Sequence, residues 1–343
     1  MKAKKNEEGK KGITPIQHIK KGRINTRDWK KFFLVAHLCL FSLASFANAG
    51  QPASGTVQAQ KNYSFIGMVE ESLFGDPTDP WSPLSLSTFF SEGWNEPFDY
   101  PVNGSGGAPR QGWINSYDGV FYRLWFLSYS NTHNFHDNGN QDIGSYTLFA
   151  PISKRFQLRF DVPFFVSNRG GQTNDYNNNF GDFVISPRFL LSESQDFTQI
   201  LAVPVRTPTG DKDNGNDVTS ITPQYEFWSN VYKTWVVRGG IGTTLPTQSK
   251  QGRYSFNYNV AIGVFLTPHD RTPFGDLTLY VAGDGFSTID DRASDVDFFS
   301  ITPGFRSHMG RDWYLLGGVE VPLTGPDSAS FDYEPNVWVM KVF

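Results

Sequence analysis

Cysteine and long apolar runs are nearly absent from this 343-residue sequence, whose one cysteine is Cys39. Cys39 lies in an N-terminal segment that we expect to be removed, so neither disulfides nor thiolate metal sites are expected in the mature chain. After residue 50, no apolar run approaches the roughly 20 residues of a transmembrane helix. The mean hydropathy of −0.39 does not exclude a membrane barrel, because its lumen residues dilute those that face lipid.

The first 49 residues have the pattern of a signal peptide. Six Lys and Arg residues lie between Lys20 and Lys31, residues 32–46 are mostly apolar, and residues 47–49 read Ala-Asn-Ala, a small-x-small cleavage motif. We therefore expect export and cleavage near Ala49. An uncleaved inner-membrane anchor is the alternative, and it is disfavoured because the apolar segment is short for a membrane span.

Negative charge dominates the sequence once this leader is set aside. The remaining chain has 19 Lys and Arg against 31 Asp and Glu, a net charge of −12. So acidic a protein is repelled by the phosphate backbone, and we expect no nucleic-acid partner. The charge suits an exported protein with solvated acidic loops.

Residues 50–118 differ in composition from the rest of the chain. They are rich in Pro, Gly, Ser and Trp, and residues 84–94 could form a short helix. A disordered linker is disfavoured because such linkers rarely contain this many aromatic residues. The region is interpreted as a periplasmic extension or a plug folded into a barrel formed by residues 119–343.

From residue 119 onward, apolar and polar residues alternate with period two. In residues 155–166 one face of the predicted strand carries Phe156, Leu158, Phe160, Val162 and Phe164, and the other carries Arg155, Gln157, Arg159 and Asp161. Residues 254–266 and 276–284 repeat the pattern. Because successive strand side chains point to opposite sides, each such strand has one lipid-like face and one watery face.

The same test applied throughout predicts an all-β fold, a transmembrane antiparallel barrel of about twelve strands. Short connections alternate with long ones rich in Asn, Asp and Gly, which is typical of outer-membrane barrels, and an even strand count places both ends of the barrel in the periplasm. The strands are expected to start near Gly119, Ile143, Arg155, Gly181, Phe197, Val218, Thr234, Tyr254, Gly275, Asp297, Asp312 and Phe331.

The last seven residues, 337–343, form an apolar strand that ends in Phe343. A terminal aromatic on the last strand is the signal that the outer-membrane assembly machinery reads in most barrels, so we expect that machinery as a partner. Lys341 departs from the apolar alternation, although a lysine near the membrane interface can extend its charge into water.

Prolines inside the expected strands argue against the barrel, because proline cannot donate to the ladder. Pro163, Pro204 and Pro322 precede long loops and are expected at strand ends. A second set lies on the returning strands and would need bulges or solvated rims: Pro187, Pro223 and Pro303.

Residues 180–247 contain five short motifs: Gly181-Asp182, Ser186-Pro187-Arg188-Phe189, Val203-Pro204, Pro208-Thr209-Gly210-Asp211 and Thr222-Pro223-Gln224-Tyr225. With these motifs the stretch resembles the meta-pathway phenol-degradation family of outer-membrane proteins, which are described as transporter-like. The resemblance implies a barrel, suggests uptake of small aromatic or apolar compounds and brings no catalytic residues.

Ten charged residues fall on the predicted inward face and are our candidate pore-lining residues. Both signs are present, so they could form a pore lining whose transverse field selects solutes. Alternatively they could be a salt-bridged lumen that only stabilises a closed barrel, since twelve strands lie between filled and open barrels. The ten are Arg159, Asp161, Arg188, Arg206, Glu226, Arg238, Asp276, Asp284, Arg306 and Glu320.

No metal, nucleotide or other cofactor is expected. His133 and His136 are three apart, but in a loop rather than on a helix that could direct both at one metal. Residues 211–217 resemble a calcium loop but lack the glutamate of its twelfth position. The glycines at 239–242 lie inside a strand with no helix after them, which favours close strand packing over a nucleotide site.

Three function classes remain, with a transporter-like channel for small solutes preferred over a structural or surface-interaction barrel. A barrel-embedded lipid-modifying enzyme is least favoured, because no histidine falls within a predicted strand where a nucleophile could meet it. The expected location is the outer membrane, with its lipid and a small-molecule solute as partners.

Overall fold

The computed structural model describes residues 63–75, 81–110, 112–136, 138–170, 175–211, 214–290, 296–324 and 330–343. The predicted signal peptide and part of the calcium-like loop lie outside these residues. Within the described ranges, no helix is both long and apolar enough to cross a membrane.

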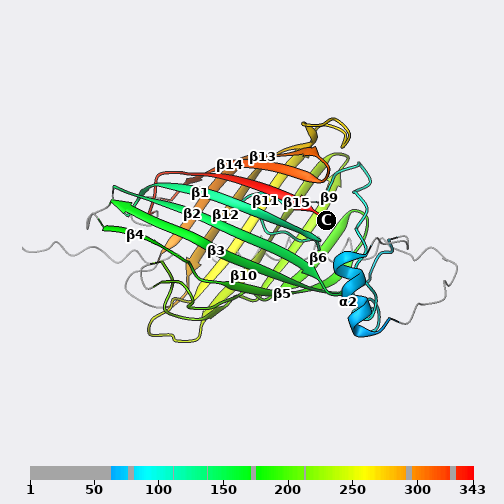
Figure 1. Ribbon diagram of the computed structural model, residues 1–343, viewed down its shortest axis with the longest axis horizontal. Coiled ribbons are helices and arrows are strands. Elements are labelled where there is room, and N and C mark those ends of the chain that lie inside the picture. The colour runs from blue at the N-terminus through cyan, green and yellow to red at the C-terminus, as the bar shows by residue number, and fades with distance from the viewer. Residues whose placement is uncertain are drawn as a thin grey trace, which may run out of the picture. The chain divides into compact units, whose positions relative to one another are not determined.

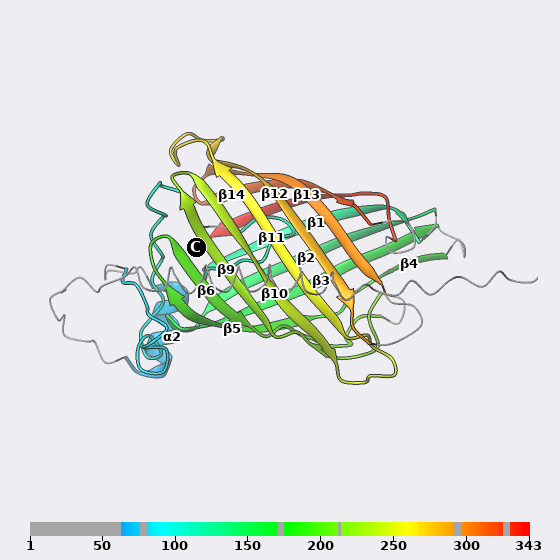
Figure 2. The same ribbon diagram turned by 180° about the vertical axis from the view of Figure 1, so that it is seen from behind.

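Twelve strands form a closed antiparallel ring, which confirms the predicted fold class (Figures 1 and 2). Each strand pairs with the next, and the last closes on the first from Leu124 opposite Val342 to Ser130 opposite Asn336. The ring consists of β1 (Leu124–Phe135), β2 (Gly139–Pro151), β3 (Phe156–Gly170), β5 (Val184–Glu193), β6 (Phe197–Ala202), β9 (Gln224–Tyr232), β10 (Trp235–Pro246), β11 (Ser255–Phe265), β12 (Gly275–Thr288), β13 (Asp297–Gly310), β14 (Trp313–Pro322) and β15 (Glu334–Val342).

Three short strands lie outside the ring. β4 (Asp175–Asn179) pairs with β3 beyond the barrel wall. β7 (Val205–Arg206) and β8 (Ser220–Ile221) pair with each other and, respectively, with β5 and β10. β7 follows β6 after an interruption at Pro204, and β8 precedes β9, from which Pro223 separates it.

The strands alternate between an exposed apolar outer face and a buried inner face. On β11, Val260 and Ile262 are 55% and 48% exposed, whereas Asn259 and Ala261 are buried. The same alternation holds for β12, where Leu279 is exposed and its neighbours Thr278 and Tyr280 are buried. An apolar belt of this extent around a closed ring is the surface that a membrane-spanning barrel presents to lipid.

Four of the five connections at one end of the barrel are short, as predicted, and the fifth, residues 266–274 between β11 and β12, is longer. Residues 152–155, 194–196, 233–234 and 311–312 are tight turns at this end, which we call the short-turn end. The helix α2 (Phe65–Phe74) lies at the same end, where it contacts β2 (Figures 1 and 2). The sequence did not predict α2, and residues 84–94 form successive turns rather than the short helix expected there.

Proline placement agrees only in part with expectation. Pro204 follows β6 and Pro322 ends β14, as expected, but Pro163 lies within β3 at a register shift opposite Ser145. Pro187 and Pro303 lie inside β5 and β13 in unshifted register, so the expected bulges are wrong there. Neither proline has an N–H group, but a strand residue directs its N–H toward only one of its two neighbouring strands, so at most one hydrogen bond is lost. The Pro187 carbonyl still accepts from Val203 N at 2.9 Å.

The barrel interior at the short-turn end is filled by residues 112–123, which we call the luminal segment. The first ring strand begins at Leu124 rather than near Gly119, because Gly119 turns the chain at φ +58° inside the barrel. A Cβ there would lie 2.3 Å from the Phe227 backbone. Trp113 and Ile114 of the segment belong to one buried cluster with strand residues such as Trp228, Tyr280 and Leu316.

We predict that replacing Val260 by Arg will destabilise the barrel by about 2–4 kcal/mol, the cost of a cation near the bilayer midplane. Asn257→Arg is the matched control, since Asn257 lies on the same strand with its side chain inward and half-buried. Urea titration of protein refolded into phospholipid vesicles measures both. Equal costs would show that the apolar belt does not contact lipid.

Gln157 and Asn259 are unsuitable controls, contrary to the sequence expectation that they face water. Both are buried in contacts with the luminal segment: Gln157 Nε2 donates to Tyr122 O at 2.6 Å, and Asn259 Nδ2 donates to Asn115 O at 2.8 Å. A cation at either position would displace the segment rather than enter water.

Candidate functional site: a charged cavity above the luminal segment

The luminal segment forms the floor of a cavity within the barrel. Asn115 turns the chain with a φ of 51°, a left-handed conformation that asparagine tolerates better than most residues. Strand side chains hold the turn in place: Tyr280 Oη accepts from Ile114 N at 2.9 Å, and Asn259 Oδ1 accepts from Tyr117 N at 3.0 Å. The floor therefore depends on polar contacts with the wall.

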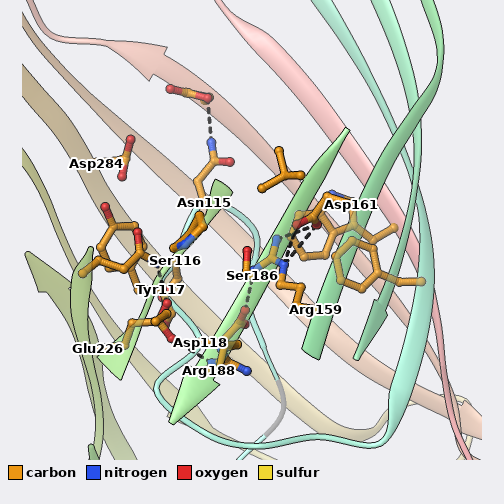
Figure 3. A pocket seen from close by; sticks show the side chains of 17 residues that line it. Asn115, Ser116, Tyr117, Asp118, Arg159, Asp161, Ser186, Arg188, Glu226 and Asp284 are labelled. Atoms are coloured by element: carbon orange, nitrogen blue, oxygen red, sulfur yellow. Dashed lines mark hydrogen bonds and ion pairs between the residues drawn. The ribbon is translucent and has the colours of Figure 1, made fainter. Parts of the chain in front are cut away.

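The cavity has a volume of about 410 Å³ and is lined by strands from both sides of the barrel (Figure 3). Five carboxyl groups and two guanidinium groups face it, together with aromatic side chains. The charged residues are Asp118, Asp161, Glu226, Asp284, Glu320, Arg159 and Arg188.

The two arginines lie on neighbouring strands and are ion-paired. Arg159 of β3 contacts Asp161 Oδ1 at 2.9 Å and Asp118 Oδ2 at 2.9 Å. Arg188 of β5, almost fully buried, contacts Glu226 Oε2 at 2.7 Å. One wall thus has its cations neutralised by carboxylates from the strands and from the luminal segment.

The opposite wall has unneutralised acidic groups. Asp284 of β12 accepts from Asn259 Nδ2 at 3.1 Å, and Glu320 of β14 accepts from Ser300 Oγ at 2.7 Å and Asn115 Nδ2 at 2.6 Å. Among the described residues, neither carboxylate forms an ion pair with Lys or Arg. The acidic groups of this wall are thus held by hydrogen-bond donors rather than by cations.

Asp118 connects the floor to two strands at once. Beyond Arg159, its Oδ1 lies 3.4 Å from Arg238 Nη2, and Arg238 also donates from Nε to Tyr117 O at 2.9 Å. Burial raises the pKa of Asp118, while Arg159 and Arg238 act to lower it. Its contacts with the two guanidinium groups hold the segment to β3 and β10.

Below the floor, packed side chains fill the lumen. The Trp113 ring stacks on Tyr280 with centroids 5.0 Å apart, and the Arg238 guanidinium lies over Trp113 at 5.4 Å. In the part of the chain that the structure describes, the cavity ends at this layer. Passage to the short-turn end would require the luminal segment to move.

The structure brings six of the ten candidate residues to the cavity: Arg159, Asp161, Arg188, Glu226, Asp284 and Glu320. Arg238 lies beneath the floor. Asp276 and Arg306 lie at the short-turn end, where Arg306 donates to Thr278 Oγ1 at 3.2 Å. Arg206 lies toward the other end, 3.9 Å from Asp182.

Sequence reasoning missed the floor residues Asn115, Ser116, Tyr117 and Asp118. Strand alternation gives no information on a segment that is not a strand. The signal available was a polar tetrapeptide between apolar residues, Trp113-Ile114 before it and Val120-Phe121 after it, which is what a turn buried in a mostly apolar setting requires.

Two histidines lie in strands, which corrects the expectation that none would. His133 is in β1 and His308 in β13. His308 stacks on His269 at 4.0 Å, and His269 Nδ1 lies 2.7 Å from Asp276 Oδ2. Among the described residues, no hydroxyl is hydrogen-bonded to a histidine ring and no group of three His, Cys, Asp or Glu could hold a metal ion.

Comparison with known proteins gives a family and a fold. Residues 103–338 match the family described as "Putative MetA-pathway of phenol degradation". An outer membrane channel from Pseudomonas putida F1 is 12% identical, with a TM-score of 0.51 over 67% of this chain and 98% of that chain. The KdgM porin is 11% identical, with a TM-score of 0.41 over 64% and 99% of the two chains. No curated protein matches.

We predict that Arg188→Met will destabilise the protein by about 3–5 kcal/mol, because it leaves the buried Glu226 carboxylate without its cation. The double variant Arg188→Met/Glu226→Leu should recover much of that loss, since it removes both buried charges. Thermal unfolding of the wild-type protein, Arg188→Met and the double variant measures the three stabilities. If the double variant is less stable than Arg188→Met, Glu226 is not stabilised chiefly by Arg188.

Proposed function

This chain belongs to the family matched by residues 103–338, and on that premise we propose that it is an outer-membrane channel for small solutes. The luminal segment is its gate. The observation that carries the proposal is the cavity: six charged strand residues converge on open space within the ring. A lumen whose salt bridges served only stability would gain by filling that space with side chains.

The cavity walls suggest the class of solute. Its volume of about 410 Å³ lies within the usual range of about 300–1,000 Å³ for small-molecule sites. Tyr117, Phe126 and Trp338 line it beside the carboxylates, and the Phe126 and Trp338 rings stack at 4.4 Å. A small aromatic compound with hydroxyl or amino substituents would stack on these rings and donate to Asp284 or Glu320.

Passage is proposed to follow release of the floor from the wall. The contacts that must break include the two ion pairs of Asp118, with Arg159 and Arg238, and the hydrogen bonds of Asn259 and Tyr280 with the luminal segment. They are side-chain contacts rather than strand pairing, so they can separate without opening the barrel ring.

We predict that Asn259→Ala combined with Tyr280→Phe will raise single-channel conductance or open probability in planar bilayers, because two anchors of the floor are lost. Tyr225→Phe is the control, since its hydroxyl bonds Gln199 instead of the segment. The channel proposal fails if neither this variant nor a chain lacking residues 50–118 carries current or solute flux.

Export and assembly are part of the proposal. The leader is cleaved near Ala49, and the last strand, whose terminal Phe343 carbonyl accepts from Arg123 and Tyr100, is recognised by the outer-membrane assembly machinery. We propose no catalytic activity. Hydrolysis of lipid esters by the pure protein, abolished by replacing one histidine, would contradict that view.

We predict that the protein will fractionate with outer membranes with Gly50 as its N-terminus, and that it will migrate differently on gels before and after boiling. A closed ring has no free edge at which detergent can begin to unfold it. N-terminal sequencing and heat-shift gels are the measurements. Recovery in the soluble periplasm without a heat shift would refute the membrane location.

A further inference from the structure

The helix α2 exposes its apolar face to the surroundings instead of burying it. Phe65, Ile66 and Phe74 are 71%, 69% and 81% exposed, whereas Met68 and Ser72 are buried. A surface helix of a soluble domain has the reverse arrangement. An exposed apolar face of this kind marks a binding surface.

This helix is fixed to the barrel, so its apolar face is held in one orientation. Ser72 Oγ donates to Ile152 O at 3.0 Å in the turn between β2 and β3, and accepts from Phe98 N at 3.0 Å. At the C-terminal end of the helix, Arg123 Nη1 donates to Gly75 O at 2.7 Å.

A second exposed apolar group lies on residues 84–94 and is also anchored. Leu86 and Phe90 are exposed, Phe90 to 91%. Leu84 exchanges two backbone hydrogen bonds with Glu193 at the end of β5, of 2.9 and 2.8 Å. Arg155 donates to Ser85 O at 2.8 Å and to Glu92 O at 3.0 Å.

A continuous series of rings joins this group to the outer wall of the barrel. Phe90 contacts Phe89 with centroids 4.9 Å apart, and Phe89 contacts Trp94 at 5.4 Å. Trp94 then contacts Phe189 at 6.4 Å, and Phe189 stacks on Phe156 at 5.4 Å. Phe156 and Phe189 are outward residues of β3 and β5, on the face that the proposed function places in lipid.

We propose that α2 and residues 84–94 form an interfacial anchor that inserts into the periplasmic leaflet of the outer membrane. The occupant of the exposed apolar surface is phospholipid, because the ring series makes residues 84–94 continuous with the lipid-facing wall. The Ser72 hydrogen bond to Ile152 O fixes α2 at the same end of the barrel. This inference rests on the proposed membrane location and adds a second lipid-binding element to the barrel.

The charge of the anchor specifies the headgroup. The exposed face of α2 carries Glu70 between Ile66 and Phe74, and the helix has no Lys or Arg. A carboxylate at the interface is repelled by anionic headgroups and attracted by an ammonium. The surface therefore fits a zwitterionic aminophospholipid such as phosphatidylethanolamine.

The anchor can be tested with single cysteines labelled by an environment-sensitive fluorophore, in a chain whose Cys39 is replaced by Ser. The variants are Ile66→Cys and Phe90→Cys, with Asn103→Cys as the control because Asn103 is an exposed polar residue at the same end. Val260→Cys reports on the barrel wall. Each protein is refolded into phosphatidylethanolamine-rich vesicles that contain a nitroxide lipid.

Labels at positions 66 and 90 should be quenched by the nitroxide lipid at least about twofold more than the label at 103, as expected for side chains about 5–10 Å into the headgroup and acyl boundary. Quenching at 260 but not at 66 and 90 would overturn the anchor and leave the membrane barrel intact. Absence of quenching at 66 and 90 would count against the anchor in every case: if the labels stay in water, if another part of the chain covers them, or if a second copy of the protein covers them. Absence of quenching at 260 would refute the membrane location itself, and the anchor with it.

Discussion

The ion pairs of Asp118 are the interaction on which the interior of this protein depends. One carboxylate on the luminal segment meets Arg159 of β3 and Arg238 of β10, which lie on different parts of the ring. Charges this buried are stable only with their partners, and removing one leaves an uncompensated charge. The arrangement therefore fixes where the segment crosses the lumen, and with it the floor of the cavity.

Placement of the floor divides the lumen into two unlike parts. Toward the short-turn end, Trp113 and Tyr280 stack within an apolar cluster that fills the barrel. Above the floor, carboxylates and guanidinium groups surround open space. Because the boundary between them consists of side-chain contacts to a non-strand segment, the closed state is compatible with a gate that opens while the ring keeps its ladder.

The short-turn end also ties the lumen to the outside of the barrel. Arg123, the residue before β1, donates to the end of α2 and to the terminal carbonyl of Phe343. The helix, the start of the ring and its last residue thus meet at one side chain. Movement of the proposed lipid anchor would therefore displace Arg123, the residue at which the luminal segment ends and β1 begins.

The number of strands and the inward or outward direction of most strand side chains were determined by the sequence alone, because period-two alternation is a local property of strands and twelve of them suffice to close a ring. Six of ten candidate residues accordingly face the cavity. The structural effect of the prolines was predicted less well. Whether a strand accommodates Pro187 without a bulge depends on which neighbouring strand its backbone groups face. Only the tertiary structure decided that residues 112–123 enter the lumen, where Asp118 meets Arg238 from 120 positions along the chain, because such ion pairs depend on distances in space that no local pattern encodes.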